Sequence, residues 1–108
     1  MKITKNEAIK RSREGVKGTY YQLPDIEDGT MIAYAEFTGE HGESTIKDKF
    51  RIYYILDGEG KFIVDQQEVE VSEGDVVPIK EGSTYNIFPT SDVLKVILYM
   101  EYVDFEQK

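Results

Sequence analysis

The side chains of this sequence that are best suited to binding chemistry are cations and phenols on segments rich in apolar residues. Arg51 and Tyr53 are two residues apart, so their side chains point to the same face of an extended strand. Lys47 precedes them, and Tyr85 lies in a later segment of similar character. A guanidinium binds a carboxylate or a phosphate through paired hydrogen bonds, each worth about 1.5–3 kcal/mol. Side chains of these types suit the binding of a small anion wherever a fold brings them together.

The cysteine and histidine content of the sequence limits the kinds of catalytic and metal site that it can form. The sequence has no cysteine, which excludes disulfides, thiolate catalysis and cysteine-ligated metal sites. Its single histidine, His41, lies between Gly39 and Gly42 and close to Glu43. Glycines and acidic neighbours are typical of an exposed loop. We therefore interpret His41 as a solvated loop residue, and we expect no metal ion or other cofactor.

The elements that must position these residues are mostly strands. Eight runs are rich in β-branched and aromatic residues, and many short strands at close spacing favour a sandwich or a barrel. Thr4 and Glu7 have the spacing of a capping box, which predicts one short helix over 4–12. The eight predicted strands cover 19–23, 31–37, 51–56, 61–64, 68–71, 76–79, 84–88 and 93–103.

Turn residues and alternation refine this expectation. The segments 57–60 and 65–67 each separate two apolar runs, as the turn of a β-hairpin would. The run 52–56 is apolar at every position, so both of its faces need cover from another layer or from a second copy of the chain. Tyrosines are frequent and suit interfaces, and the long strand 93–103 could lie at a sheet edge. Together these features favour a homodimer.

Length and charge limit the classes of partner. The 108 residues suit a single domain. The formal charge of −8 argues against nucleic acid, because phosphate binding needs a cationic face. We interpret Lys10, Arg11, Arg13 and Lys17 as the solvated surface of the N-terminal helix rather than a binding patch. No apolar run suggests a membrane span or a signal peptide, so we expect no membrane partner and a cytoplasmic location.

Glycine spacing adds a more specific indication. Gly39, Gly58, Gly74 and Gly82 occupy the glycine positions of the two sequence motifs of the cupin superfamily. In that register, the places of the three histidines and the glutamate of metal-binding cupins read Thr45, Lys47, Arg51 and Tyr85. The chain thus resembles a small, single-domain cupin of bacterial type with degenerate metal-binding motifs. Because cations at ligand positions repel a metal ion, the resemblance implies a metal-free domain.

The same resemblance implies the architecture and the place of the site. It predicts a mainly β chain, with a single-domain cupin-type β-barrel or jelly roll over 17–108 and a short N-terminal helix and arm over 1–16. It also implies that Arg51, Tyr53 and Tyr85 point into the barrel, with Lys47 within the pocket or at its rim.

Cupins carry many activities, so three functions stay open. The first is a metal-free domain that binds a small anionic or sugar-like metabolite through these cations and phenols. The second is a metal-independent sugar isomerase or epimerase, with Tyr85 as acid and Glu36 or Glu43 as base. The third is a structural, dimeric protein without a ligand, in which Arg51 pairs internally with an acid, for which Glu36 is the best candidate.

Overall fold

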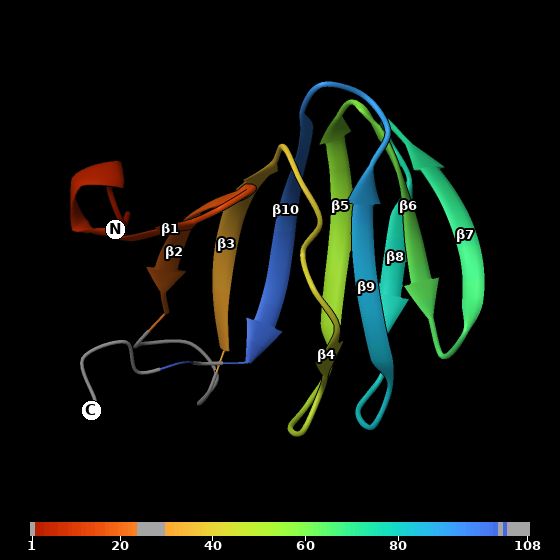
Figure 1. Ribbon diagram of the computed structural model, residues 1–108. Coiled ribbons are helices and arrows are strands. Elements are labelled where there is room, and N and C mark those ends of the chain that lie inside the picture. The colour runs from red at the N-terminus through yellow and green to blue at the C-terminus, as the bar shows by residue number, and fades with distance from the viewer. Residues whose placement is uncertain (1, 24–29, 102, 104–108) are drawn as a thin grey trace.

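The structure is a computed structural model that describes residues 2–23, 30–101 and 103, and it consists of two antiparallel sheets packed face to face (Figure 1). The larger sheet has the order β1 (Ile9–Arg13), β2 (Val16–Gln22), β3 (Thr30–Phe37), β10 (Leu94–Glu101), β5 (Arg51–Asp57), β8 (Val76–Ile79). The smaller sheet has the order β4 (Ser44–Thr45), β9 (Thr84–Pro89), β6 (Glu59–Val64), β7 (Gln67–Ser72). The predicted mainly β fold is confirmed.

All eight predicted strands are present, and the predicted N-terminal helix is present only as a short 3₁₀ turn. Only a 3₁₀ turn, η1 (Lys5–Glu7), forms at the N-terminus, where the Glu7 carboxylate accepts hydrogen bonds from the backbone and the hydroxyl of Thr4, both at 2.8 Å. The chain then enters β1, which pairs along its whole length with β2. Within the described residues, no helix is long and apolar enough to cross a bilayer.

Strand β1 also changes the interpretation of the basic cluster near the N-terminus. Arg11 and Arg13 lie opposite Gly18 and Val16, whose side of the sheet is buried, whereas Lys10 lies opposite Thr19 on the other side. The cluster is therefore divided between two faces of a strand, and its interpretation as a helix surface is wrong. The division of the chain into an arm and a β domain at residues 16 and 17 stays a prediction.

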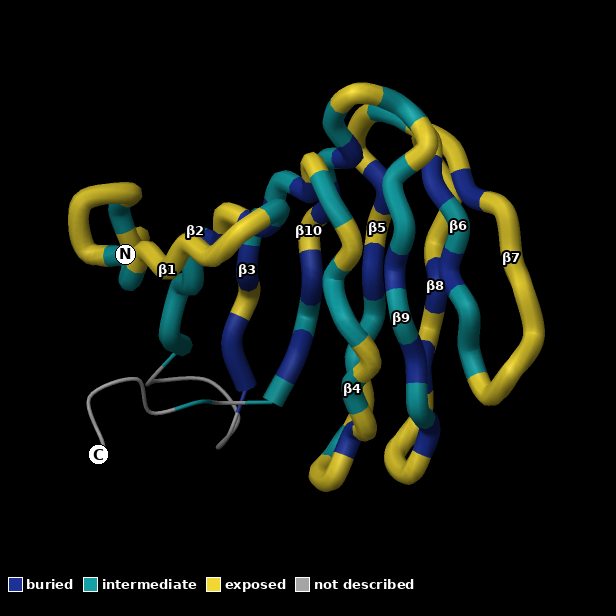
Figure 2. Tube along the Cα trace, viewed as in Figure 1, coloured by how far each residue is buried: buried dark blue, intermediate teal, exposed yellow. Residues whose placement is uncertain are grey.

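The core fills the space between the two sheets. Buried positions alternate with exposed or half-buried ones along β3, β10 and β5 (Figure 2). On β5, Tyr53 and Ile55 point inward and are 1% and 0% exposed. Tyr54 and Leu56 point outward and remain exposed, so one of the two apolar faces of this strand lacks a cover within the described part of the chain. Strand β10 lies between β3 and β5, so the expectation of an edge strand there is wrong.

The two predicted hairpin turns have different outcomes. Asp65 and Gln66 form the two-residue turn between the paired strands β6 and β7, both with positive φ (49° and 73°). The turn at Gly58 does not close a hairpin, because β5 and β6 belong to different sheets. Gly58 has a φ of 91°, and a side chain there would collide with the backbone oxygen of Val93. Glycine is thus required where the chain crosses between the sheets.

We predict that Gly58→Ala destabilises the fold far more than Gly74→Ala. Both glycines are in the left-handed region, at φ 91° and 92°, so each substitution costs about 1 kcal/mol in backbone strain. Gly74 has open space around its Cα, whereas Gly58 faces backbone atoms that cannot move away cheaply. We expect a loss of about 3 kcal/mol at Gly58 in denaturant unfolding. Equal losses in the two variants would contradict the steric explanation.

Candidate functional site

Three of the predicted site residues meet between the sheets. Arg51 begins β5, Tyr53 follows two residues later on the same face, and Tyr85 lies near the start of β9 in the smaller sheet. The Arg51 guanidinium donates from Nη1 to the Tyr85 hydroxyl at 2.6 Å, and the hydroxyl oxygens of Tyr53 and Tyr85 are 2.6 Å apart. The sequence prediction that these side chains point inward together is therefore correct in geometry, while their role in binding a ligand stays a prediction.

Arg51 also has an internal counter-charge. Its Nε and Nη2 donate to the two carboxylate oxygens of Glu101, at 2.9 and 2.7 Å. The two side chains are 14% and 16% exposed, so water screens the pair weakly. Burial alone would lower the pKa of Arg51, but the hydrogen bonds to Glu101 and the nearby phenols more than offset it and raise that pKa. Arg51 is therefore a permanent, neutralised cation.

Glu36, the acid expected to pair with Arg51, lies elsewhere. It accepts a hydrogen bond from the Tyr34 hydroxyl at 2.8 Å on the outer face of β3, since its neighbours Ala35 and Phe37 are buried. Burial and then the bond to Glu36 raise the pKa of Tyr34 to about 12. The internal pairing of Arg51 is thus present, but with a different acid. Glu101 lies 50 residues away in the sequence, so only the sheet order brings it to Arg51.

His41 belongs to this cluster, so its interpretation as a solvated loop residue is wrong. Its ring stacks on Tyr85, with centroids 5.4 Å apart and an interplanar angle of 28°, and meets the edge of Phe37 at 5.8 Å. Nδ1 lies 2.7 Å from the carbonyl oxygen of Gly42. Because a carbonyl can only accept, Nδ1 carries the hydrogen, and in the neutral ring the lone pair is on Nε2.

The electrostatic surroundings of the cluster keep His41 neutral. Burial, followed by the positive charges of Arg13 and Arg51, lowers the pKa of His41, although the Gly42 carbonyl acts in the opposite direction. Burial and then Tyr85 raise the pKa of the Tyr53 hydroxyl well above its ordinary value. At neutral pH the cluster thus holds an uncharged imidazole at His41 and a protonated hydroxyl at Tyr53.

Two sets of contacts fix the segment that carries His41. The Gly15 carbonyl accepts from the backbone N–H groups of Thr38 and Gly39, at 2.9 and 3.2 Å. The Asn86 side chain accepts from the Gly42 N–H at 2.8 Å and donates to Glu40 at 2.7 Å. These partners are 23 to 46 residues away, and no local pattern around His41 indicates them, which is why sequence reasoning missed this residue.

Lys47, the fourth predicted residue, is at the surface. It is exposed and follows Ile46, which is 1% exposed and whose N–H donates to the Ser83 carbonyl at 3.0 Å. The structure does not bring Lys47 into the cluster, and its participation in ligand binding stays a prediction.

The donor set of the cluster does not suit a divalent metal ion. Among the described residues, no three histidine, cysteine, aspartate or glutamate side chains converge on one point. The cluster offers one imidazole, two phenols and a carboxylate that is already engaged by Arg51. A guanidinium beside them would repel a cation. The side chains of the cluster therefore do not fit a metal site of the usual cupin kind.

Access to the cluster is limited. Tyr53 and Tyr85 are each 1% exposed. Arg51 borders a largely apolar groove of about 530 Å³, whose other walls include Phe50, Ile79 and Ser83. His41 is less buried than the two tyrosines of the cluster, with intermediate exposure.

Comparison with solved structures identifies the architecture. A nucleoside dehydratase from Streptomyces superposes with a TM-score of 0.81 at 18% identity, over 94% of this chain and 81% of the dehydratase. A predicted oxalate decarboxylase from Thermotoga maritima gives 0.77 at 23% identity, over 95% and 100% of the two chains. KdgF from Halomonas gives 0.75 at 14% identity, over 94% and 93%. The chain has a cupin-like fold.

These likenesses concern the fold of the cupin-like chain and not its activity. Further structures of the same dehydratase contain uridine together with a single substitution, which replaces one of two tyrosines by phenylalanine or a histidine by glutamine. No protein-family model and no curated protein matches the sequence.

We predict that Glu101→Gln destabilises the protein by about 2 kcal/mol, because it leaves the buried Arg51 charge without a compensating charge. A matched control is Glu68→Gln, which removes a carboxylate that is 62% exposed and pairs with Lys61 at 3.5 Å. An exposed pair of this kind contributes less than about 1 kcal/mol. Denaturant unfolding of both variants measures the difference, and a loss at Glu101 no larger than at Glu68 would contradict our view of Arg51.

Proposed function

We propose that this cupin-like chain binds a small sugar-like or nucleoside-like molecule beside His41 and Tyr85, and that it acts on this molecule by metal-free acid–base chemistry. The observation that carries the proposal is the stacked pair of His41 and Tyr85, in which the phenol is held by Arg51 and Tyr53. A base and an acid with different protonation states lie side by side, and this is what proton transfer at carbon and oxygen requires.

His41 suits the role of general base. Its Nδ1 hydrogen is bound to Gly42, so the ring is oriented and Nε2 is available to take a proton. Its pKa is lowered by burial and by neighbouring positive charges, so the imidazole is neutral at physiological pH. The sequence-based alternatives for the base, Glu36 and Glu43, are less suitable, because Glu36 lies on the outer face and Glu43 is exposed.

Tyr85 suits the role of general acid. Its oxygen accepts a hydrogen bond from Arg51 and, because Tyr53 stays protonated, can accept a second from that phenol. The proton of Tyr85 is then free to be given to a leaving group. The two donors that remain stabilise the resulting phenolate, as preorganised donors do wherever charge develops in a transition state.

The reaction class that fits is elimination of water next to a carbonyl group. Nε2 of His41 takes the proton from the carbon beside the carbonyl, and that electron pair forms the new double bond. The carbon–oxygen bond at the next carbon breaks, and the departing hydroxyl takes the Tyr85 proton and leaves as water. Protonated His41 returns its proton to the Tyr85 phenolate through solvent. If the first proton returns to carbon instead, the same residues perform an isomerisation.

Two features support a nucleoside or sugar as the ligand. The ring of His41, which has intermediate exposure, provides a flat surface for stacking. The nucleoside dehydratase that shares this fold has been solved with uridine in variants of two tyrosines and a histidine, which are the residue types that meet here. An internal packing cluster is the second candidate, favoured by the burial of both tyrosines and by the neutralisation of Arg51.

The single histidine provides a direct test, because its ring signals in the NMR spectrum are unambiguous. We expect uridine, D-xylose or D-glucuronate at millimolar concentration to shift the His41 signals saturably. Tyr85→Phe should weaken this binding by about tenfold through the loss of one hydroxyl. The absence of any saturable shift would favour the internal packing cluster.

Catalysis is tested by exchange in deuterium oxide with the two carbonyl sugars. We expect deuterium at the carbon beside the carbonyl, and no exchange in His41→Gln. The rate should rise with pH through the pKa of His41, below its ordinary value of about 6.5, and level off above it, because only the neutral ring accepts a proton. Binding without exchange would leave a binding protein and remove the catalytic role.

We also propose that the chain forms a homodimer through the outer face of its larger sheet. Val76, Tyr54 and Ile97 are cross-strand neighbours on β8, β5 and β10. A second apolar row crosses the same strands and β3 and comprises Pro78, Ile52, Tyr99 and Ile32. Neither row contains a charge, and a flat apolar face that meets its own copy across a two-fold axis is self-complementary.

Light scattering at tens of micromolar should therefore report a dimer for the native chain and a monomer for Ile97→Glu, which places a charge at the centre of this face. The control is Val69→Glu on the smaller sheet. The two native side chains are 38% and 41% exposed, so an effect of surface charge alone would be the same in both. A native monomer, or a dimer that survives Ile97→Glu, would refute the interface.

A further inference from the structure

We propose that Arg13 on β1 binds an anionic group of the ligand, so that the preferred molecules are acidic sugars or sugar phosphates rather than neutral ones. This inference rests on the proposed function of the His41 site and adds the class of substrate to it. Arg51 is the cation that the sequence suggests for an anion, but its two donor edges are engaged by Glu101 and Tyr85. An anion must therefore find another cation near the cluster.

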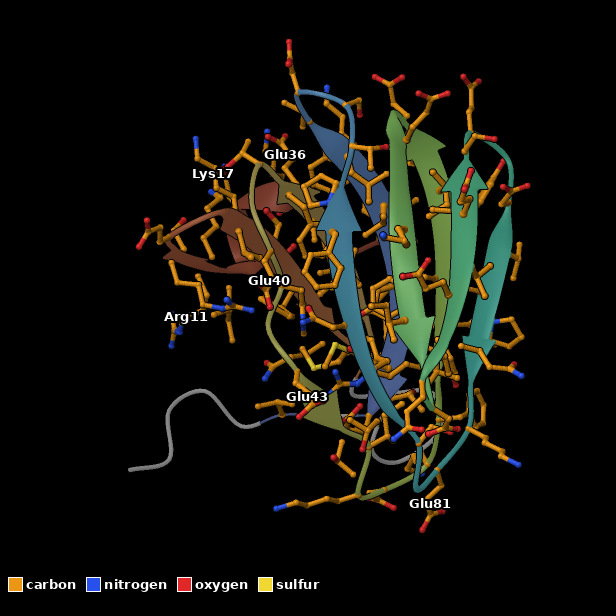
Figure 3. All side chains as sticks on the ribbon, turned by 45° about the vertical axis from the view of Figure 1, so that its right-hand side comes forward. Arg11, Lys17, Glu36, Glu40, Glu43 and Glu81 are labelled. Atoms are coloured by element: carbon orange, nitrogen blue, oxygen red, sulfur yellow. The ribbon has the colours of Figure 1, made fainter. Side chains whose placement is uncertain are left out.

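The pairing of β1 places Arg13 on the inner face of the larger sheet. Arg13 lies opposite Val16, which in turn lies opposite Phe37. Val16 and Phe37 are 8% and 2% exposed and belong to the core, so side chains at this register project toward the interior side. Figure 3 shows the alternation on the same hairpin, with Arg11 and Lys17 on opposite sides of the ribbon.

A close backbone contact brings Arg13 near His41. Gly15 and Gly39 pack so closely that a Cβ on Gly15 would lie 3.0 Å from the Gly39 Cα, and the Gly15 carbonyl bonds to the Thr38 and Gly39 N–H groups. Arg13 precedes one of these glycines by two residues, and His41 follows the other by two. The charge of Arg13 is accordingly among those that lower the pKa of His41.

Arg13 is available to a ligand. Within the described residues it makes no hydrogen bond and no ion pair, in a chain with 21 acidic and 13 basic residues in which a counter-ion is easily found. Glu40, which lies on the neighbouring segment, is held by the Asn86 amide at 2.7 Å. An exposed guanidinium without a partner, beside a neutral base, presents a planar fork to a carboxylate or a phosphate.

The test compares matched probes through the His41 NMR signals at low salt. Uridine is paired with uridine 5′-monophosphate, and D-galactose with D-galacturonate, so that the two pairs distinguish phosphate from carboxylate. We expect the charged member of at least one pair to bind about tenfold more tightly, in line with one charge-assisted hydrogen-bond pair at a solvated site. Arg13→Gln should remove this preference and leave the affinity for the neutral member unchanged.

The control is Lys10→Gln, which removes the same charge from the outer face of the same strand and should keep the preference. Equal affinity for charged and neutral probes, or a preference that survives Arg13→Gln, would overturn the role of Arg13 while the proposed function stands. If Lys10→Gln also removes the preference for the charged probe, the preference depends only on net charge, and this result would also overturn the role of Arg13. If neither member of either pair binds, the proposed function fails, and the role of Arg13 fails with it.

Discussion

The bidentate pair between Arg51 and Glu101 is the interaction on which the rest of the site depends. A guanidinium in the interior costs several kcal/mol unless its charge is compensated, and Glu101 compensates it through two short hydrogen bonds. The remaining donor then holds the Tyr85 hydroxyl, across the space between the sheets. One ion pair thus sets the position of the phenol, and the phenol in turn provides the surface on which His41 stacks.

The segment that carries His41 is positioned by backbone contacts rather than by its own propensity. Gly15 accepts two hydrogen bonds from the start of this segment, and Asn86 holds it at Gly42. The contact between Gly15 and Gly39 also fixes the end of the β1–β2 hairpin. His41 and Arg13 are therefore brought near each other, His41 from a loop and Arg13 from the end of β1, through this contact between the two glycines.

Sequence reasoning succeeded where the relevant signal is local. Alternation on 51–56 correctly placed Tyr53 with Arg51, and glycine spacing indicated the cupin-like architecture. It failed for β1, where capping residues suggested a helix, because pairing with β2 outweighs the local preference. It also missed Glu101 and His41, since strand order and the Asn86 contact bring them to the cluster from distant parts of the chain. Long-range partners of this kind leave no local trace.

Two arginines have different places in the proposed function. Arg51 holds the Tyr85 hydroxyl inside the cluster, and Arg13 is the proposed site for an anion. The pair of Arg51 and Glu101 has no net charge, so the electrostatic field that it creates around Tyr85 is weaker than that of a single cation. The proposed recognition of an anion at Arg13 would keep the second cation at the solvated margin of the cluster, where its charge favours neutral His41 and its desolvation costs little. In the proposed function, neutralisation of the interior cation would allow acid–base chemistry and anion recognition to lie side by side in one small fold.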